Sequence, residues 1–170
     1  MDFKWIGAIL IVSSCTACGF SIAAGKRKEE QLLLQLLRVF QLMETELQYR
    51  LTPLPELCRM AAGATKGNLR NVFANLHREL CGQKLPDAGS CMAAAIGKSE
   101  ELPSRIRSIL SQLGYGLGEY DLEGQLRGIR AVRRRAEDSL EYIRKNRDER
   151  LRSYQTLGIC AGAALAIILI

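Results

Sequence analysis

Apolar residues recur every three or four positions along residues 27–51, and polar residues separate them. This spacing gathers the apolar side chains on one face of an α-helix. The expected face consists of Leu32, Leu33, Leu36, Leu37, Val39, Phe40, Met43, Leu47 and Leu51. The pattern therefore predicts a long amphipathic helix that packs on the rest of a helical domain.

Two prolines end this first pattern. Thr52 precedes Pro53, and proline disfavours the helical conformation of the residue before it, so the helix is expected to end there. A threonine hydroxyl can cap the next helix while proline occupies its first position, where no backbone N–H is needed. We therefore predict a corner in which Thr52 caps a second helix that begins at Pro53 and turns Leu54 toward the core.

Four further helical segments follow the corner. Their expected boundaries are Asn68 to Gly82, Cys91 to Gly97, Pro103 to Leu113 and a last helix capped by Asp121. The expected core face of the last helix consists of Leu122, Leu126, Ile129, Val132, Ala136, Leu140 and Ile143. No stretch alternates with the period of a strand, so the predicted class is all-α, an antiparallel bundle of about six helices.

Both ends of the chain lack charge. Residues 5–25 and 153–170 contain no acidic or basic side chain, and Asp2 offsets Lys4, so the middle carries the whole net charge of +6. At about 1.5 Å per residue the first stretch can cross a hydrocarbon core about 30 Å thick, and the second is a marginal span. We predict transmembrane helices at 4–25 and 153–170, with a helical domain at 26–152 between them.

Basic residues beside both stretches set the expected orientation. They are Lys26, Arg27 and Lys28 after the first, and Arg144, Lys145, Arg147, Arg150 and Arg152 before the second. Basic flanks stay on the cytoplasmic side, so the domain is expected in the cytoplasm of a two-pass membrane protein, with the second cluster at anionic lipid headgroups. Two alternatives stay open at the N-terminus. One is an extracytoplasmic lipoprotein adaptor processed at Cys15, and the other is a signal peptide cleaved near Ala23.

A run of arginines lies on the last predicted helix. Arg127, Arg130 and Arg134 share one face. Three interpretations stay open: a solvated or partner-facing surface, contact with lipid headgroups, and nucleic-acid binding. The expected ion pairs of the first interpretation are Arg133–Glu137 and Arg134–Asp138. The run contains no interleaved aromatic residue for base stacking, and a membrane tether keeps DNA distant, so we favour the first and expect no nucleic-acid partner.

No group of residues assembles into a catalytic, cofactor or metal site. The single histidine, His77, has no second ligand at metal-binding spacing, which favours a structural role. Gly114, Gly116 and Gly118 form GxGxG, but no strand precedes them, so we expect a tight turn that uses the positive φ of glycine. All six cysteines are expected to be small buried hydrophobic residues. The prediction is a protein without enzymatic activity or cofactor.

The apolar C-terminal stretch contains a GxxxG motif. Gly158 and Gly162 are followed by Ala166 at the same spacing. Small residues at this interval allow another membrane helix to approach closely. Helix association through this face, including a homo-oligomer, is therefore a hypothesis.

Two blocks, taken with the order of the parts, resemble a known family. The first is E-x-x-Y-x-x-TPL at Glu46, Tyr49, Thr52, Pro53 and Leu54. The second is LGxxLGxxD, which places Gly114, Leu117, Gly118 and Asp121 in one predicted turn. With a membrane segment at each end, the whole chain resembles the stage III sporulation protein AB family of spore-forming Firmicutes.

The resemblance implies a non-catalytic subunit of the channel assembly between mother cell and forespore. The soluble domain of the family is similar to the cytoplasmic domains of the type II secretion platform protein, which face a secretion-type ATPase. In this system the implied partner is stage III sporulation protein AA, together with other channel membrane proteins. The two turns, and the arginine face, are the interaction sites that we expect.

Overall fold

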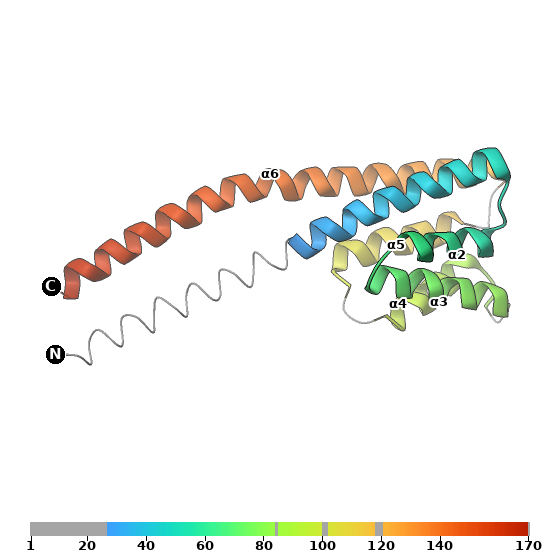
Figure 1. The fold of residues 1–170 in the computed structure, drawn as a ribbon, viewed down its shortest axis with the longest axis horizontal. Coiled ribbons are helices and arrows are strands. Elements are labelled where there is room, and N and C mark those ends of the chain that lie inside the picture. The colour runs from blue at the N-terminus through green and yellow to red at the C-terminus, as the bar shows by residue number, and fades with distance from the viewer. Residues whose placement is uncertain (1–26, 84, 100–101, 118–120, 170) are drawn as a thin grey trace. The chain divides into compact units, whose positions relative to one another are not determined.

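The computed structural model describes residues 27–83, 85–99, 102–117 and 121–169, with side chains up to residue 145. These residues form six helices and no strand (Figure 1). A helix over 27–50 is followed by α2 (Leu54–Ala64), α3 (Asn68–Gly82), α4 (Ala88–Gly97), α5 (Ser104–Gly116) and α6 (Leu122–Leu169). The predicted all-α class is confirmed for the described part of the chain.

Residues Glu29–Leu140 form one compact unit, and the two ends of the chain belong to a second. The predicted membrane helix at 4–25 lies outside the described residues, as do the side chains of the predicted second span at 153–170. Within the described residues, no helix combines the length and the apolar character needed to cross a membrane.

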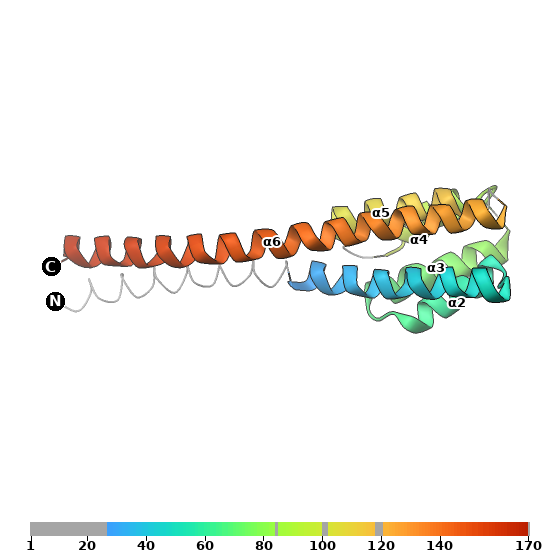
Figure 2. The same cartoon turned by 90° about the horizontal axis from the view of Figure 1, so that it is seen from above.

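Successive helices of the compact unit run in alternating directions. α2 packs on α3, α3 on α4 and α4 on α5, while the helix over 27–50 lies beside α6 (Figure 2). Because the directions alternate, the bundle has two distinct ends. The corner end carries the connections from 50 to 54, from α3 to α4 and from α5 to α6. The entry end carries the other two connections and the points where the chain enters and leaves the unit.

Interactions of Arg105 define the entry end. Its Nε lies 3.9 Å from a carboxylate oxygen of Glu29, and its Nη1 donates a hydrogen bond of 3.5 Å to the backbone oxygen of Ser139. One side chain of α5 therefore touches both the start of the first helix and the part of α6 near Leu140.

The core lies where the apolar stripes of the six helices meet. Nearly every position predicted to be apolar and buried is buried in the structure. The largest fully buried side chains include Phe40, Phe73, Leu33, Leu36, Met43, Leu57, Leu69, Leu76, Met92, Ile106, Ile109 and Leu110. The predicted face was wrong at Leu51 and Leu122, which are 65% and 40% exposed. Each lies at the end of a helix.

Side-chain caps start two of the helices. Asp87 accepts a hydrogen bond of 2.6 Å from the backbone N–H of Ser90 at the start of α4. The backbone N–H groups of the first helical turn have no acceptor within the helix, and this carboxylate accepts from one of them. It also lies at the positive end of the helix dipole. Asp121 accepts a hydrogen bond of 3.0 Å from the N–H of Gly124 and so caps α6, as predicted.

Candidate interaction site

The corner between the first helix and α2 differs from the one predicted from the sequence, because residues 51–53 all lie outside a helix. Leu51 ends the first helix with a left-handed backbone, at φ 51°. α2 then starts at Leu54, with Pro53 in the capping position and Pro55 inside the first turn. The predicted cap by Thr52 is therefore wrong. The capping position falls one residue later because Pro53 takes the extended conformation at φ −59° and ψ 146°.

Thr52 instead links the corner to the first helix through a side-chain hydrogen bond. Its hydroxyl donates a hydrogen bond of 3.0 Å to the carboxylate of Glu46, which is only 8% exposed. Arg50 lies 3.4 Å from the same carboxylate. A buried carboxylate needs such partners, since leaving it unpaired costs the full desolvation penalty. Glu46 and Thr52 of the family-like block are thus structural residues of the corner.

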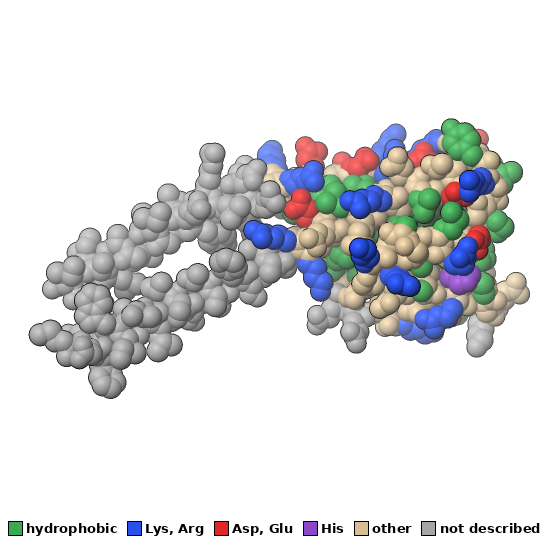
Figure 3. Space-filling model, in the orientation of Figure 1, with side chains coloured by type: hydrophobic (Ala, Val, Ile, Leu, Met, Phe, Trp, Pro, Cys, Tyr) green, Lys and Arg blue, Asp and Glu red, His purple; other side chains and the backbone are tan. Residues whose placement is uncertain are grey.

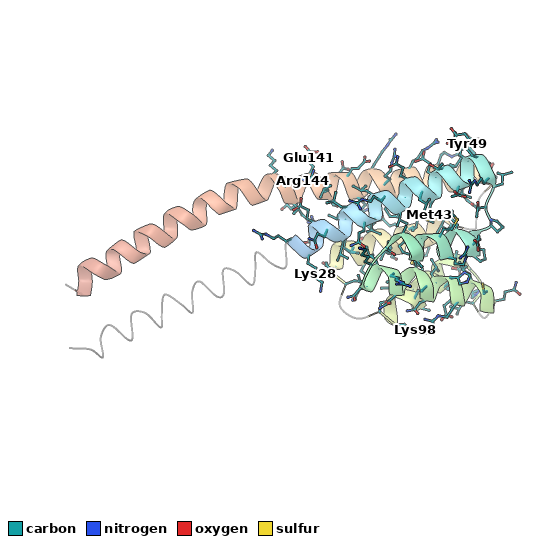
Figure 4. The ribbon with its side chains drawn as sticks, viewed as in Figure 1. Lys28, Met43, Tyr49, Lys98, Glu141 and Arg144 are labelled. Carbon is teal, nitrogen blue, oxygen red and sulfur yellow. The ribbon has the colours of Figure 1, made fainter. Side chains whose placement is uncertain are left out.

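The apolar residues of this block differ from one another in exposure. Tyr49 is 76% exposed and projects from the corner end (Figure 4). Figure 3 shows hydrophobic side chains at the same place on the surface. Pro53 is exposed, and Leu54 is half-buried on α2. Tyr49 and Leu51 therefore form the exposed apolar part of the corner.

Gly114 and Gly116 do not form the tight turn that the sequence predicted for them. Gly114 and Gly116 lie inside α5, and the only described glycine with a positive φ is Gly67. A Cβ at Gly114 would lie 2.5 Å from the Cβ of Met92 on α4, and a Cβ at Gly116 would lie 3.6 Å from the Cα of Gly128 on α6. The prediction of a tight turn was wrong for these two glycines. They instead allow α5 to approach α4 and α6 closely.

The remainder of this block leads from α5 into α6. Leu117 is almost fully buried, and its N–H donates a hydrogen bond of 3.4 Å to the oxygen of Gly114. Gly118 lies outside the described residues. Tyr115 is 66% exposed and lies over Gly89, where an added Cβ would come within 3.1 Å of its ring. Sequence reasoning missed Tyr115, because the glycines on either side of it had suggested a turn.

The arginines of α6 separate into paired and unpaired groups. Glu44 of the first helix accepts a hydrogen bond of 2.6 Å from Nε of Arg130 and lies 3.4 Å from Nη1 of Arg133. Arg133 also lies 3.7 Å from Glu137, which confirms that predicted pair. Arg127 and Arg134 are exposed, and no carboxylate of a described residue lies within ion-pair distance of either. The predicted pair between Arg134 and Asp138 is therefore not formed, and of the shared face only Arg130 pairs with a described carboxylate.

The described residues contain no group of side chains that could hold a metal ion. Nδ1 of His77 lies 2.8 Å from the backbone oxygen of Pro55 and donates to it, because a carbonyl oxygen can only accept. This bond ties α3 to the first turn of α2, which agrees with the structural role expected of His77.

The cysteines differ in their surroundings. Cys58 and Cys91 are buried free thiols, and burial raises the pKa of both, that of Cys58 to about 12. Cys81 is exposed, so the expectation that every cysteine is buried was wrong for this residue. Thiolate is the nucleophilic form, so the raised pKa makes the two buried thiols unreactive. The thiols of Cys15, Cys18 and Cys160 lie outside the described side chains.

The predicted membrane-helix contact cannot be placed on described side chains. Gly158, Gly162 and Ala166 lie in the part of α6 whose backbone alone is described. The same holds for most of the basic cluster at 144–152. Both remain predictions.

The fold and surface place the chain among all-α proteins built as an antiparallel bundle, with exposed apolar side chains at one end. A family model described as stage III sporulation protein AB matches residues 4–170. The chain therefore belongs to the stage III sporulation protein AB family and has a role in sporulation.

A solved structure agrees with this assignment in its fold. The chain titled "Stage III sporulation protein AB (SpoIIIAB)" is similar with a TM-score of 0.60 and 20% sequence identity. The match covers 69% of the present chain and 94% of the solved one. Among curated proteins, no match was found.

Proposed function

We propose that the protein is a membrane-anchored, non-enzymatic subunit of the channel complex between mother cell and forespore. Its helical domain binds a secretion-type ATPase, stage III sporulation protein AA, on the mother-cell side and connects it to membrane components. Family membership supports the sporulation role. The uncharged stretches at 5–25 and 153–170 support anchoring at both ends of the domain.

One observation carries the scaffolding role. Arg105 contacts Glu29 through an ion pair and Ser139 through its backbone oxygen, so the chain enters and leaves the bundle at the same end. When both connecting segments leave a domain at one end, the other end stays accessible to a partner. The corner end is the part of the bundle that both connections leave uncovered.

Co-purification from sporulating cells tests the proposal. The full-length chain, tagged at its N-terminus and extracted in mild detergent, should retain stage III sporulation protein AA, whereas an unrelated two-pass membrane protein with the same tag should not. Retention should not require a hydrolysis step, because the proposed role is binding. The proposal fails if the ATPase is absent from the purified complex in every nucleotide condition.

Labelling of Cys81 tests the cytoplasmic orientation, because this thiol is exposed whereas Cys58 is buried. A membrane-impermeant maleimide should leave Cys81 unmodified in intact cells and modify it after permeabilisation, as read from its peptide by mass spectrometry. Labelling of Cys81 in intact cells would instead favour the lipoprotein adaptor. An N-terminus that begins at a lipidated Cys15 would identify that alternative directly.

A further inference from the structure

Large apolar side chains that remain exposed are concentrated at the corner end. Five such residues are exposed in the described part of the chain: Tyr49, Leu51, Tyr115, Leu122 and Tyr142. The first two end the first helix, Tyr115 ends α5 and Leu122 starts α6, so four of the five lie at one end of the alternating bundle. An exposed apolar group at one place is typical of a protein-binding surface.

Ion pairs across the first helix and α6 bring three of these residues together. Glu44 contacts both Arg130 and Arg133, and the two helices run in opposite directions. In this register, Tyr49 and Leu51 lie opposite the first turn of α6, which begins at Leu122. We name Tyr49, Leu51, Leu122 and Arg127 the corner surface. Arg134 lies further along α6, toward Ser139 and the entry end.

Leu51 shows that stability did not select this surface. Its left-handed backbone is strained for a residue with a branched side chain, and glycine or asparagine is the usual residue at this position after a helix. A buried leucine could compensate for such strain by packing, but Leu51 is 65% exposed. Its side chain therefore adds strain to the fold while most of its surface stays exposed, as expected of a residue that binds a partner.

The charge beside the apolar residues indicates the chemistry of the partner. Glu44 already binds Arg130 and Arg133, while Arg127 and Arg134 lie exposed on the outer face of α6 without a carboxylate among the described residues. Of these two, Arg127 lies near the first turn of α6, and an unpaired guanidinium group at the margin of an apolar patch favours a partner with an acidic side chain at the matching position. The bilayer is a poor occupant, since both chain connections leave the bundle at the opposite end.

We propose that the corner surface docks a protein partner whose contact face has an apolar centre and an acidic margin. Tyr49, Leu51 and Leu122 enter the apolar centre, and Arg127 pairs with a carboxylate at its margin. That this partner is the secretion-type ATPase rests on the proposed function.

Substitution of Leu51 separates binding from folding. Leu51→Gly removes both the strain and the side chain, so it should raise the melting temperature while weakening affinity. Tyr49→Ser should weaken affinity without changing the melting temperature beyond a degree or so. Each of these two substitutions removes apolar area that the complex would bury, and each should therefore raise the Kd by about ten- to hundredfold. A merely structural role of Leu51 predicts the same gain in stability with no change in Kd.

The measurement uses the full-length chain in detergent and purified stage III sporulation protein AA as the probe, with Kd read by biolayer interferometry. Tyr142→Ser is the matched control for an exposed tyrosine elsewhere. Arg127→Glu should raise the Kd at low salt by several-fold or more, on the order of 1 kcal/mol for one charge reversal at the margin, and flatten its salt dependence. Arg70→Glu, an exposed arginine on α3, is the charge control and should leave the Kd within about twofold of wild type.

The outcomes distinguish the two proposals. If the wild-type chain does not bind the ATPase, the proposed function fails. If it binds and the Tyr49, Leu51 and arginine variants bind equally well, the corner surface is the wrong site and the proposed function stands. A change confined to self-association of the variants, with unchanged ATPase affinity, would assign the surface to a second copy and overturn this inference.

Discussion

Gly114 allows α5 to pack closely on α4. A Cβ added there would lie 2.5 Å from the Cβ and 2.9 Å from the Cγ of Met92, and 3.4 Å from the Cα of Gly89. Non-bonded carbon atoms prefer separations of about 3.5–4.0 Å, so in Gly114→Ala the distance between the two Cβ atoms would be about 1 Å too short. A rotamer change of Met92 cannot relieve this, because its Cβ is fixed to the backbone. α4 and α5 must therefore move apart.

The expected cost follows from two opposing terms. Overpacking in a well-filled core costs about 1–3 kcal/mol, while replacing a helical glycine by alanine returns about 1 kcal/mol or less. We expect Gly114→Ala to lower the free energy of unfolding by about 1–2 kcal/mol and the melting temperature by roughly 3–8 °C.

Chemical and thermal unfolding of the 27–152 fragment, followed by circular dichroism, measures this cost. Gly63→Ala in α2 is the matched control, because a Cβ there meets nothing within 4 Å. The control should be as stable as wild type or more stable, by up to about 1 kcal/mol. Equal or greater stability of Gly114→Ala would refute the close packing of α5 on α4.

Three further predictions concern single side chains. The hydrogen bonds of Asp87 at the start of α4 hold the pKa of its carboxyl below the usual value. Its contribution to stability is therefore complete above about pH 4 and is lost as the pH falls through the lowered pKa. Asp87→Asn should reduce the acid dependence of urea unfolding, and an unchanged dependence would contradict the cap. Iodoacetamide should modify Cys81 rapidly and Cys58 only with unfolding, as peptide mapping can show; equal rates would contradict the burial of Cys58. Thr52→Val removes the donor to buried Glu46 and should destabilise the domain by about 1–2 kcal/mol in denaturant titrations, whereas Thr52→Ser should cost less than half as much.

The helices were predictable because each has to bury an apolar stripe that repeats with the helical period. Asn68 and Gly82 bound α3 as expected, and Asp121 caps α6. The start and end of a helix depend on the few residues around them, so the local sequence is enough to predict them. The predicted apolar face was wrong at Leu51 and Leu122, which lie at helix ends, because periodicity does not show where a helix begins or ends.

The candidate site was less predictable, because its features depend on residues distant in sequence. Glycine serves both in turns and where helices approach closely, and only the position of Met92 decides between these roles for Gly114. Glu44 neutralises arginines more than eighty positions later in the chain, and no local pattern reports that pairing. Tyr49 was nominated for its place in a family-like block, whereas its exposure follows from the corner's geometry.

The exposure of Leu51 had a local signal that the periodic pattern concealed. It directly precedes Thr52 and Pro53, so it occupies the position after the last helical residue, where the backbone often becomes left-handed. A residue in that conformation leaves the helical face, and its side chain need not follow the apolar stripe. The rule for helix ends would therefore have predicted Leu51 better than the rule for helix faces.

Site-specific photocrosslinking at Tyr49 tests the central claim most directly. A benzoyl-phenylalanine at position 49 of the full-length protein, activated by light in sporulating cells, should form a covalent adduct with stage III sporulation protein AA. The same residue at Tyr142 should not form that adduct. Crosslinks from position 49 that reach only lipid, only a second copy of the chain or no protein would contradict a corner surface that binds the ATPase.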